Sequence, residues 1–207
     1  MSARLFRVLP LIALAVGSGL IVVLARQNGD LRAEAALQRR RAIYPRAGQY
    51  VPSHRVATMG GDSVTLGAGP RGEKQILLFF ESKCGFCKAD APTWNDVALR
   101  IARTPYDSIR VFGVSVDTSN LAASRYAVDH AFAFPVVRLA STRWISLFRA
   151  PAVPTIMLID SDGKILFARS GELGKRAGVD SLLALIAAKP GSRPAAVAAS
   201  LGGSIPE

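Results

Sequence analysis

The apolar stretches after residue 50 alternate between the lengths of strands and helices. Two short continuous apolar runs are typical of strands covered on both faces, and they lie at residues 75–81 and 109–116. A third, shorter strand is expected at residues 134–139. Three stretches predict helices, at residues 85–103 (where Pro92 interrupts the pattern), 120–130 and 179–188.

A turn sequence near residue 162 completes the predicted sheet. Residues 155–160 and 164–169 flank Ser161-Asp162-Gly163-Lys164, which is typical of a hairpin. The order of elements is then β-α-β-α-β, followed by a β-hairpin and a final helix. This order predicts an α/β fold in which a mixed central sheet is covered by helices.

The chain before this domain begins with an apolar run. Residues 8–25 contain no charged side chain and, at about 1.5 Å per residue in a helix, are just long enough to cross a membrane. We interpret them as a transmembrane helix that anchors the chain. The alternative is a signal sequence cleaved after Val23-Leu24-Ala25.

The remaining segments divide around the folded domain, which is expected at residues 50–189. Residues 1–7 form an N-terminal tail, and residues 26–49 form a polar helical stalk and linker. Residues 190–207 contain Pro, Gly, Ala and Ser without an apolar period and are expected to be disordered.

The net charge of +11 is carried mostly by arginine and spread along the chain. No recognition helix, zinc-finger spacing or interleaved aromatic and basic residues accompany it, so we expect no nucleic-acid partner. More basic residues follow the apolar run than precede it, and this bias by itself would place the domain in the cytoplasm. The basic start of the chain and the dithiol described next favour export instead.

Only two cysteines occur, Cys84 and Cys87, three positions apart. A scaffold of structural disulfides needs more cysteines at wider spacing. Structural zinc needs four ligands, and His54 and His130 are not spaced to complete such a set, so no metal site is expected. The pair therefore predicts redox chemistry, with a Cys84–Cys87 disulfide in place of any cofactor.

The dithiol lies where a reactive thiol is favoured, directly after a buried strand and at the start of a helix. Unpaired backbone N–H groups and the helix dipole favour a thiolate at that point. We expect Cys84 to be the nucleophile and Cys87 to be the resolving thiol. The intervening Gly85 and Phe86 are expected to contact substrate, and they leave the direction of electron flow open.

These residues resemble the thioredoxin superfamily, and within it the membrane-anchored TlpA/ResA/DsbE type, over roughly residues 50–188. Phe79 and Phe80 are similar to the aromatic approach to that family's dithiol, and Pro92 to the proline in its active-site helix. Val153-Pro154-Thr155 looks like its cis-proline loop. The resemblance implies a thioredoxin-like fold with an added N-terminal β-hairpin, here at residues 56–66. MauD-type proteins are also similar.

The resemblance also implies roles for individual residues. Pro154 is expected in the cis form, facing the dithiol and exposing the backbone of Val153 for pairing with substrate, with Thr155 beside it. Asp90 lies where ResA-type proteins carry a glutamate, one helical turn after Cys87, and is a candidate acid–base group. Glu81 is a second candidate. For both, a solvated surface acid is the alternative.

The resemblance further implies partners and a location. The expected substrates are exported proteins with disulfides, and the electrons would come from a transmembrane thiol carrier of the DsbD/CcdA type. The domain would lie on the periplasmic side of the inner membrane, held by its N-terminal helix. Cytochrome c maturation and assembly of a periplasmic enzyme are the pathways that fit.

Two other functions use related folds. A peroxiredoxin needs a threonine three residues before its reactive cysteine, and here that position is Glu81. A Sco-like copper chaperone would suit soft thiolates, but it uses wider cysteine spacing and a distal histidine, for which only His130 is available. Both remain alternatives to a thiol–disulfide oxidoreductase that acts as a reductase.

Overall fold

The computed structural model describes residues 3–103, 108–174 and 177–187, apart from the side chains of residues 3–13, 15, 40, 41 and 177. The chain divides into two units, residues 1–42 and 43–207. The tail expected at residues 190–207 lies outside the described residues, as does part of the tail at residues 1–7.

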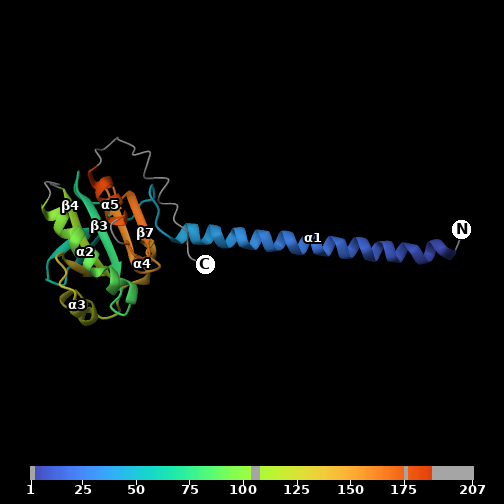
Figure 1. The fold of residues 1–207 in the computed structure, drawn as a ribbon, viewed down its shortest axis with the longest axis horizontal. Helices are drawn as coiled ribbons and strands as arrows, with labels where there is room; N and C mark the ends of the chain where they lie inside the picture. Colours follow the sequence, from blue (N-terminus) through green and yellow to red (C-terminus); the bar gives the residue numbers. More distant parts are fainter. Residues whose placement is uncertain (1–2, 104–107, 175–176, 188–207) are drawn as a thin grey trace. The chain divides into compact units, whose positions relative to one another are not determined.

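The first unit is one long helix, α1 (Ala3–Ile43), drawn in blue in Figure 1. It runs without a break from the apolar run into the polar stretch, although the sequence pattern predicts two separate segments there. Among the residues that the structure describes, none of the helices is both long and apolar enough to cross a membrane. Residues 8–13 and 15 of the expected anchor lie outside the described side chains, so the anchor stays a prediction.

The second unit is built on a mixed five-stranded sheet in the order β5-β4-β3-β6-β7. β3 pairs in parallel with β4, and β4 pairs in parallel with β5. On the other side of β3, β6 pairs antiparallel with β3, and β7 pairs antiparallel with β6. The strands are β3 (Lys74–Phe80), β4 (Ile109–Ser115), β5 (Val136–Arg138), β6 (Thr155–Ile159) and β7 (Ile165–Ser170). The mixed sheet predicted from the sequence is therefore confirmed.

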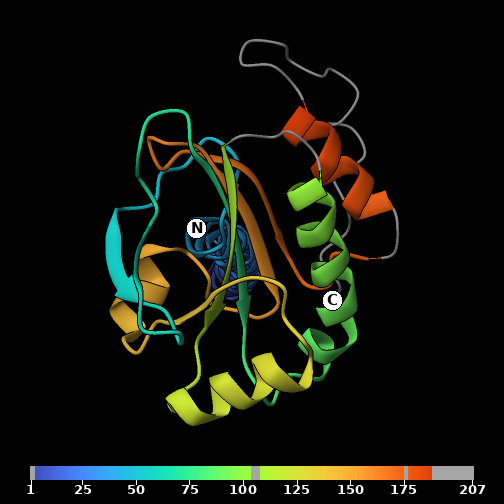
Figure 2. The ribbon, with the colours of Figure 1, turned by 90° about the vertical axis from the view of Figure 1, so that its left-hand side faces the viewer.

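Side chains of the central strand β3 point alternately into two cores, one on each face of the sheet. On one face, Leu78 and Phe80 pack with α2 (Gly85–Arg103), α3 (Asn120–Asp129) and α5 (Ala177–Ala187). On the other, Leu77 and Phe79 pack with the N-terminal strands and the segment after α4 (Thr142–Leu147). Figure 2 shows α2 and α5 on one side of the sheet and α4 on the other.

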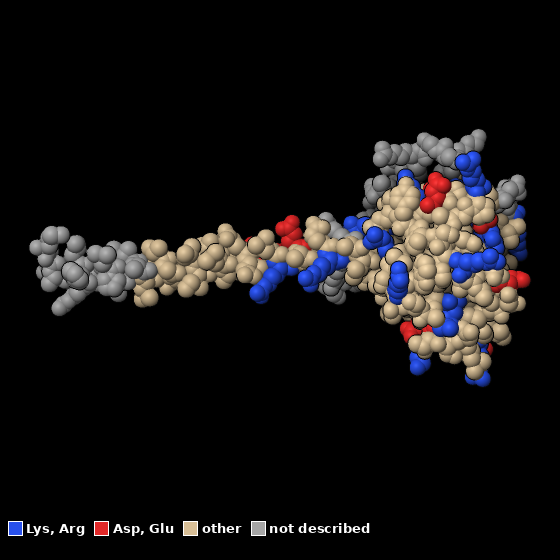
Figure 3. Space-filling view, turned by 180° about the vertical axis from the view of Figure 1, so that it is seen from behind, with Lys and Arg blue, Asp and Glu red and all other residues tan. Residues whose placement is uncertain are grey.

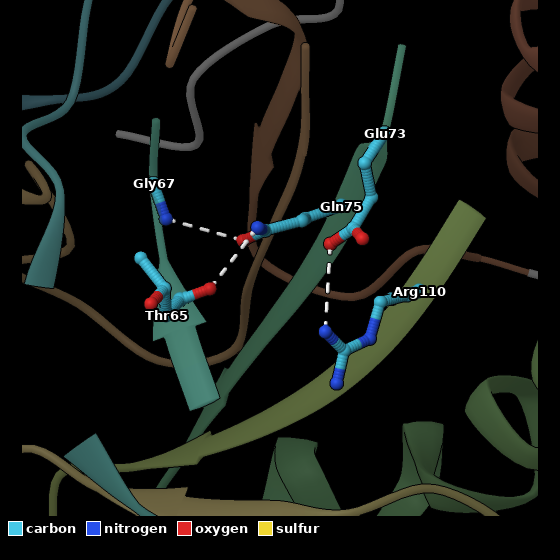
Figure 4. Close-up of polar contacts among 5 residues, drawn as sticks. All are labelled: Thr65, Gly67, Glu73, Gln75 and Arg110. Atoms are coloured by element: carbon cyan, nitrogen blue, oxygen red, sulfur yellow. Dashed lines mark hydrogen bonds and ion pairs between the residues drawn. The ribbon is translucent and has the colours of Figure 1, made fainter. Parts of the chain in front are cut away.

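The N-terminal β-hairpin predicted from the resemblance is present. β1 (His54–Ala57) pairs antiparallel with β2 (Ser63–Leu66) as a separate two-stranded sheet. The buried Gln75 ties this hairpin to β3: its amide oxygen accepts from Gly67 N–H, and its Nε2 donates to the carbonyl of Thr65, both at 3.1 Å (Figure 4). A buried polar side chain is thus satisfied at both ends.

Two details differ from the sequence prediction. Residues expected to be linker already belong to the sheet edge, since Gly48 N–H donates to the carbonyl of Ile165 at 2.8 Å, and Ile165 N–H to that of Gln49 at 2.7 Å. The helix α4 was not predicted. It is only six residues long, and it begins where Ser141 caps the amide of Arg143 at 3.3 Å.

Candidate active site

The two cysteines lie at the junction of β3 and α2. A turn over residues 81–84 joins the two elements, closed by a 3.0 Å hydrogen bond from Cys84 N–H to the carbonyl of Glu81. Cys84 directly precedes the helix, and its Sγ accepts a hydrogen bond from the backbone N–H of Cys87 at 3.2 Å. The sulfur thereby occupies the place of a helix-capping oxygen.

The dithiol faces a loop that is distant in sequence. The Val153–Pro154 peptide is cis, as predicted. The Sγ of Cys84 lies 3.7 Å from the carbonyl oxygen of Val153, within hydrogen-bond distance for a thiol. The structure therefore brings together the predicted nucleophile and the loop that the resemblance places opposite it.

The two thiols differ in accessibility. Cys84 is half-buried, whereas Cys87 is fully buried. Burial, together with a hydrogen bond to Cys84, raises the pKa of the Cys87 thiol. Phe86, between them, is 67% exposed and Gly85 is exposed as well. Cys84 is therefore the more accessible thiol, beside an exposed aromatic ring, and Cys87 is the buried one.

Asp90 is buried one helical turn after Cys87. Its Oδ2 accepts from Trp94 Nε1 at 3.2 Å and from the backbone N–H of Leu173 at 2.6 Å. Burial raises the pKa of the Asp90 carboxyl, although these two hydrogen bonds oppose the rise. Asp90 is therefore not the solvated surface acid of the alternative interpretation. Its role as acid–base group for Cys87 stays a prediction.

The other predicted site residues take different positions. Glu81 is part-exposed in the turn before Cys84. Pro154 is buried. Thr155 is buried, and its Oγ1 donates to the carbonyl of Ala152 at 2.8 Å and contacts Ser170 Oγ at 2.9 Å. The predicted contact of Thr155 with substrate stays a prediction.

Sequence reasoning missed the polar network that holds the turn before the dithiol. The buried carboxylate of Asp117 accepts from the backbone N–H of Ser82 at 3.1 Å and from its hydroxyl at 2.6 Å. It also accepts from Ser115 Oγ at 2.8 Å. Asp117 lies just beyond the end of β4, which pairs in parallel with β3 and therefore ends beside it. An acidic residue at the end of a strand next to the strand before the dithiol is the sequence feature that points to Asp117.

Sequence reasoning also missed Tyr126 on α3. Its ring stacks on Phe80 with centroids 5.1 Å apart and on His130 at 4.0 Å, and it belongs to the core cluster that contains Cys87. Nothing in the sequence marks this tyrosine, because only the fold brings α3 beside the dithiol.

Neither the surface charge in Figure 3 nor a metal-binding group marks a second site among the described residues. On the face shown in Figure 3, basic side chains are scattered among acidic ones rather than gathered in one patch. Among the residues that the structure describes, no group of three His, Cys, Asp or Glu side chains is placed to hold a metal ion. The chemistry that the described site offers is that of a vicinal dithiol.

Comparisons with known proteins give a family and relatives for the chain. Residues 47–168 match the AhpC/TSA family. A curated relative, the thiol–disulfide oxidoreductase ResA of Bacillus anthracis, is 23% identical over 128 residues, which are 62% of this chain and 72% of the relative.

Solved structures show the same fold. A thiol:disulfide interchange protein DsbE from Chlorobium tepidum, itself described as putative, aligns with a TM-score of 0.57 and 23% identity, over 68% of this chain and 95% of that one. StoA from Bacillus subtilis aligns with a TM-score of 0.54 and 18% identity, over 65% and 96%. The thioredoxin domain of a thiol–disulfide oxidoreductase from Bacteroides vulgatus aligns with a TM-score of 0.57 and 18% identity, over 69% of this chain and 99% of that one. The second unit therefore has a thioredoxin-like fold.

Proposed function

The chain belongs to the AhpC/TSA family and is a thiol–disulfide oxidoreductase of thioredoxin-like fold, and we propose that it reduces disulfides in exported proteins through Cys84 and Cys87. One observation carries the proposal. The Cys84 sulfur caps α2 and at the same time lies 3.7 Å from the Val153 carbonyl, on a loop that a substrate chain can line.

The first step is attack by Cys84 on a substrate disulfide. A bond forms between Cys84 Sγ and one substrate sulfur, the substrate S–S bond breaks, and the other substrate sulfur leaves as a thiolate that takes up a proton. The exposed Phe86 and the backbone of Val153 flank the place where this mixed disulfide forms.

The second step is attack by Cys87 on the sulfur of Cys84. Cys87 loses its proton, the Cys84–Cys87 disulfide forms, the mixed disulfide breaks, and the reduced substrate leaves. Two electrons have then passed from the dithiol to the substrate. Because burial raises the pKa of Cys87, this proton loss is the demanding part of the cycle.

The raised pKa of the Cys87 thiol is compatible with the reducing direction. A dithiol becomes a strong oxidant when its reduced form is stabilised. Because burial raises the pKa of Cys87, this residue is a thiol rather than a thiolate in the reduced protein near neutral pH. Cys87 therefore does not stabilise the reduced form through a thiolate. The names of the relatives are compatible with this direction without fixing it.

We propose the location and the partners from the apolar run at residues 8–25 together with the resemblance to membrane-anchored oxidoreductases. An uncharged segment of this length supports a membrane anchor. Electrons would then be supplied by a transmembrane thiol carrier of the DsbD/CcdA type. Cytochrome c maturation or assembly of a disulfide-rich periplasmic enzyme would consume them.

A trapping experiment tests this proposal. The full chain with Cys87→Ser, expressed in its native cells, should accumulate mixed disulfides between Cys84 and exported proteins, and these can be identified by mass spectrometry. Cys84→Ser is the matched control and should trap none. Equal trapping by both variants, or trapping of cytoplasmic proteins only, would contradict the assigned roles or the location.

A further inference from the structure

The hydroxyl of Tyr126 is buried without a partner. The residue is 5% exposed, and its Oη has no hydrogen-bond partner among the residues that the structure describes. A buried hydroxyl without a hydrogen bond is unfavourable and therefore uncommon in folded proteins. A phenylalanine would fill the same aromatic cluster without that disadvantage, so the presence of the hydroxyl calls for a physical reason.

The hydroxyl belongs to the surroundings of the dithiol. Tyr126 and Cys87 are buried in the same core cluster, and Cys84 packs against it. The Tyr126 ring is fixed by stacking on Phe80, the last residue of β3, and by an edge contact with Phe132, with centroids 5.1 and 5.8 Å apart. The ring therefore packs beside the strand that leads into the dithiol.

The charges around Tyr126 make it a donor rather than an acid. Burial, and then the neighbouring Cys87, Cys84 and Asp117, raise the pKa of its phenol, so the hydroxyl keeps its proton while the thiols react. His130, a further titratable group, stacks on the ring from the end of α3. Asp90 faces Cys87 from α2.

We propose that the Tyr126 hydroxyl donates a hydrogen bond to the Cys87 sulfur when Cys87 becomes a thiolate and attacks the mixed disulfide. In the resting dithiol, Cys87 is a protonated thiol that shares a hydrogen bond with Cys84, and the hydroxyl has no partner among the described residues. Once Cys84 is joined to substrate and Cys87 loses its proton, the Cys87 sulfur becomes a charged acceptor. A hydrogen bond to a charged sulfur is stronger than one to a neutral group.

The step leaves the chemistry of the cycle unchanged. The proton of Cys87 passes to solvent or to a neighbouring base, and the Tyr126 proton stays on its oxygen. The hydroxyl lowers the free energy of the Cys87 thiolate and thereby raises the rate of the second step only. The inference rests on the proposed function, because it assigns a role within the same dithiol cycle.

A two-phase assay separates the steps. The reduced full chain is mixed with dithiobis(nitrobenzoate), whose coloured thiol is released once when Cys84 attacks and once more when Cys87 resolves the mixed disulfide. With Tyr126→Phe, we expect an unchanged first phase and a second phase slowed about tenfold or more, as for loss of a hydrogen bond to a charged group. The rise of the second phase with pH should be displaced to higher pH.

Two controls keep the test decisive. Tyr50→Phe removes the same hydroxyl from a residue that is 60% exposed and should change neither phase. The melting temperature of Tyr126→Phe should equal or exceed that of the parent, because the lost hydroxyl has no partner among the described residues in the resting state. A second phase with the parental rate and the parental pH dependence would overturn the inference. Absence of both phases in the parent would instead overturn the proposed function.

Discussion

The Cys84 sulfur lies 3.7 Å from the carbonyl oxygen of Val153, a residue 69 positions further along the chain. One partner opens a helix and the other precedes a strand, so the contact exists only because β6 pairs antiparallel with β3. The start of α2 and the loop before β6 are thereby brought to the same end of the sheet. A substrate segment along that loop would present its sulfur directly to Cys84.

The buried position of Cys87 predicts a steep pH dependence of the resolving step. Because burial raises the pKa of this thiol, its thiolate fraction near neutral pH is small and grows about tenfold for each pH unit. The second phase of thiol release should rise accordingly between about pH 6 and pH 9. Stopped-flow measurement of the full chain would show this, and a plateau below about pH 8 would contradict it.

Asp90 should stabilise the fold through its hydrogen bonds rather than through its charge. Asp90→Ala leaves the donors of Trp94 and Leu173 buried without an acceptor and should lower the free energy of unfolding by about 2–4 kcal/mol. Asp90→Asn keeps an acceptor oxygen and removes a charge that burial disfavours, so near pH 7 it should be as stable as the parent or more stable.

Urea denaturation of the two Asp90 variants tests this difference. Equal destabilisation by both would mean that the charge itself is needed. The same proteins test the acid–base prediction, since a resolving step slowed in Asp90→Asn at unchanged stability would support it.

Asp117 should hold the turn before the dithiol. Asp117→Ala removes the acceptor for Ser82 and Ser115 and should lower the free energy of unfolding by about 2–4 kcal/mol. Ser82→Ala keeps the backbone hydrogen bond and should cost only about 1 kcal/mol. Chemical denaturation gives both values. An Asp117→Ala variant that loses little stability and releases the first coloured thiol at the parental rate would contradict this role.

Phe86 should serve binding rather than stability. Its ring is 67% exposed, so Phe86→Ala should change the free energy of unfolding by less than about 0.5 kcal/mol. We expect a higher KM for protein disulfides and an unchanged rate with small aromatic disulfides. Steady-state kinetics with both substrate types checks the prediction, and equal effects on both would show that Phe86 acts on the dithiol itself.

What could be predicted from the sequence was encoded locally. The apolar run before Cys84, the helical stretch after Cys87 and the turn at Gly163, which has a φ of +79°, each specify their own element. Once these were placed, the mixed sheet followed from the order of elements.

What could not be predicted depends on tertiary contacts. Asp117 and Tyr126 reach the dithiol only through strand order and helix packing, and neither carries a sequence signal strong enough to single it out alone. The six residues of α4 are too few to show helical periodicity. The backbone pairing of Gly48 with Ile165 likewise leaves no trace in side-chain chemistry.

Cys84 and Cys87 are expected to act in sequence on one disulfide, and product stoichiometry tests this most directly. The reduced full chain is mixed with a disulfide-linked peptide, and the products are weighed by mass spectrometry. We predict that the parent forms a Cys84–Cys87 disulfide and frees both peptide thiols, whereas Cys87→Ser stops with one peptide attached to Cys84. Peptide attached to Cys87 instead, or reaction with hydrogen peroxide but not with the peptide, would contradict this sequence of steps.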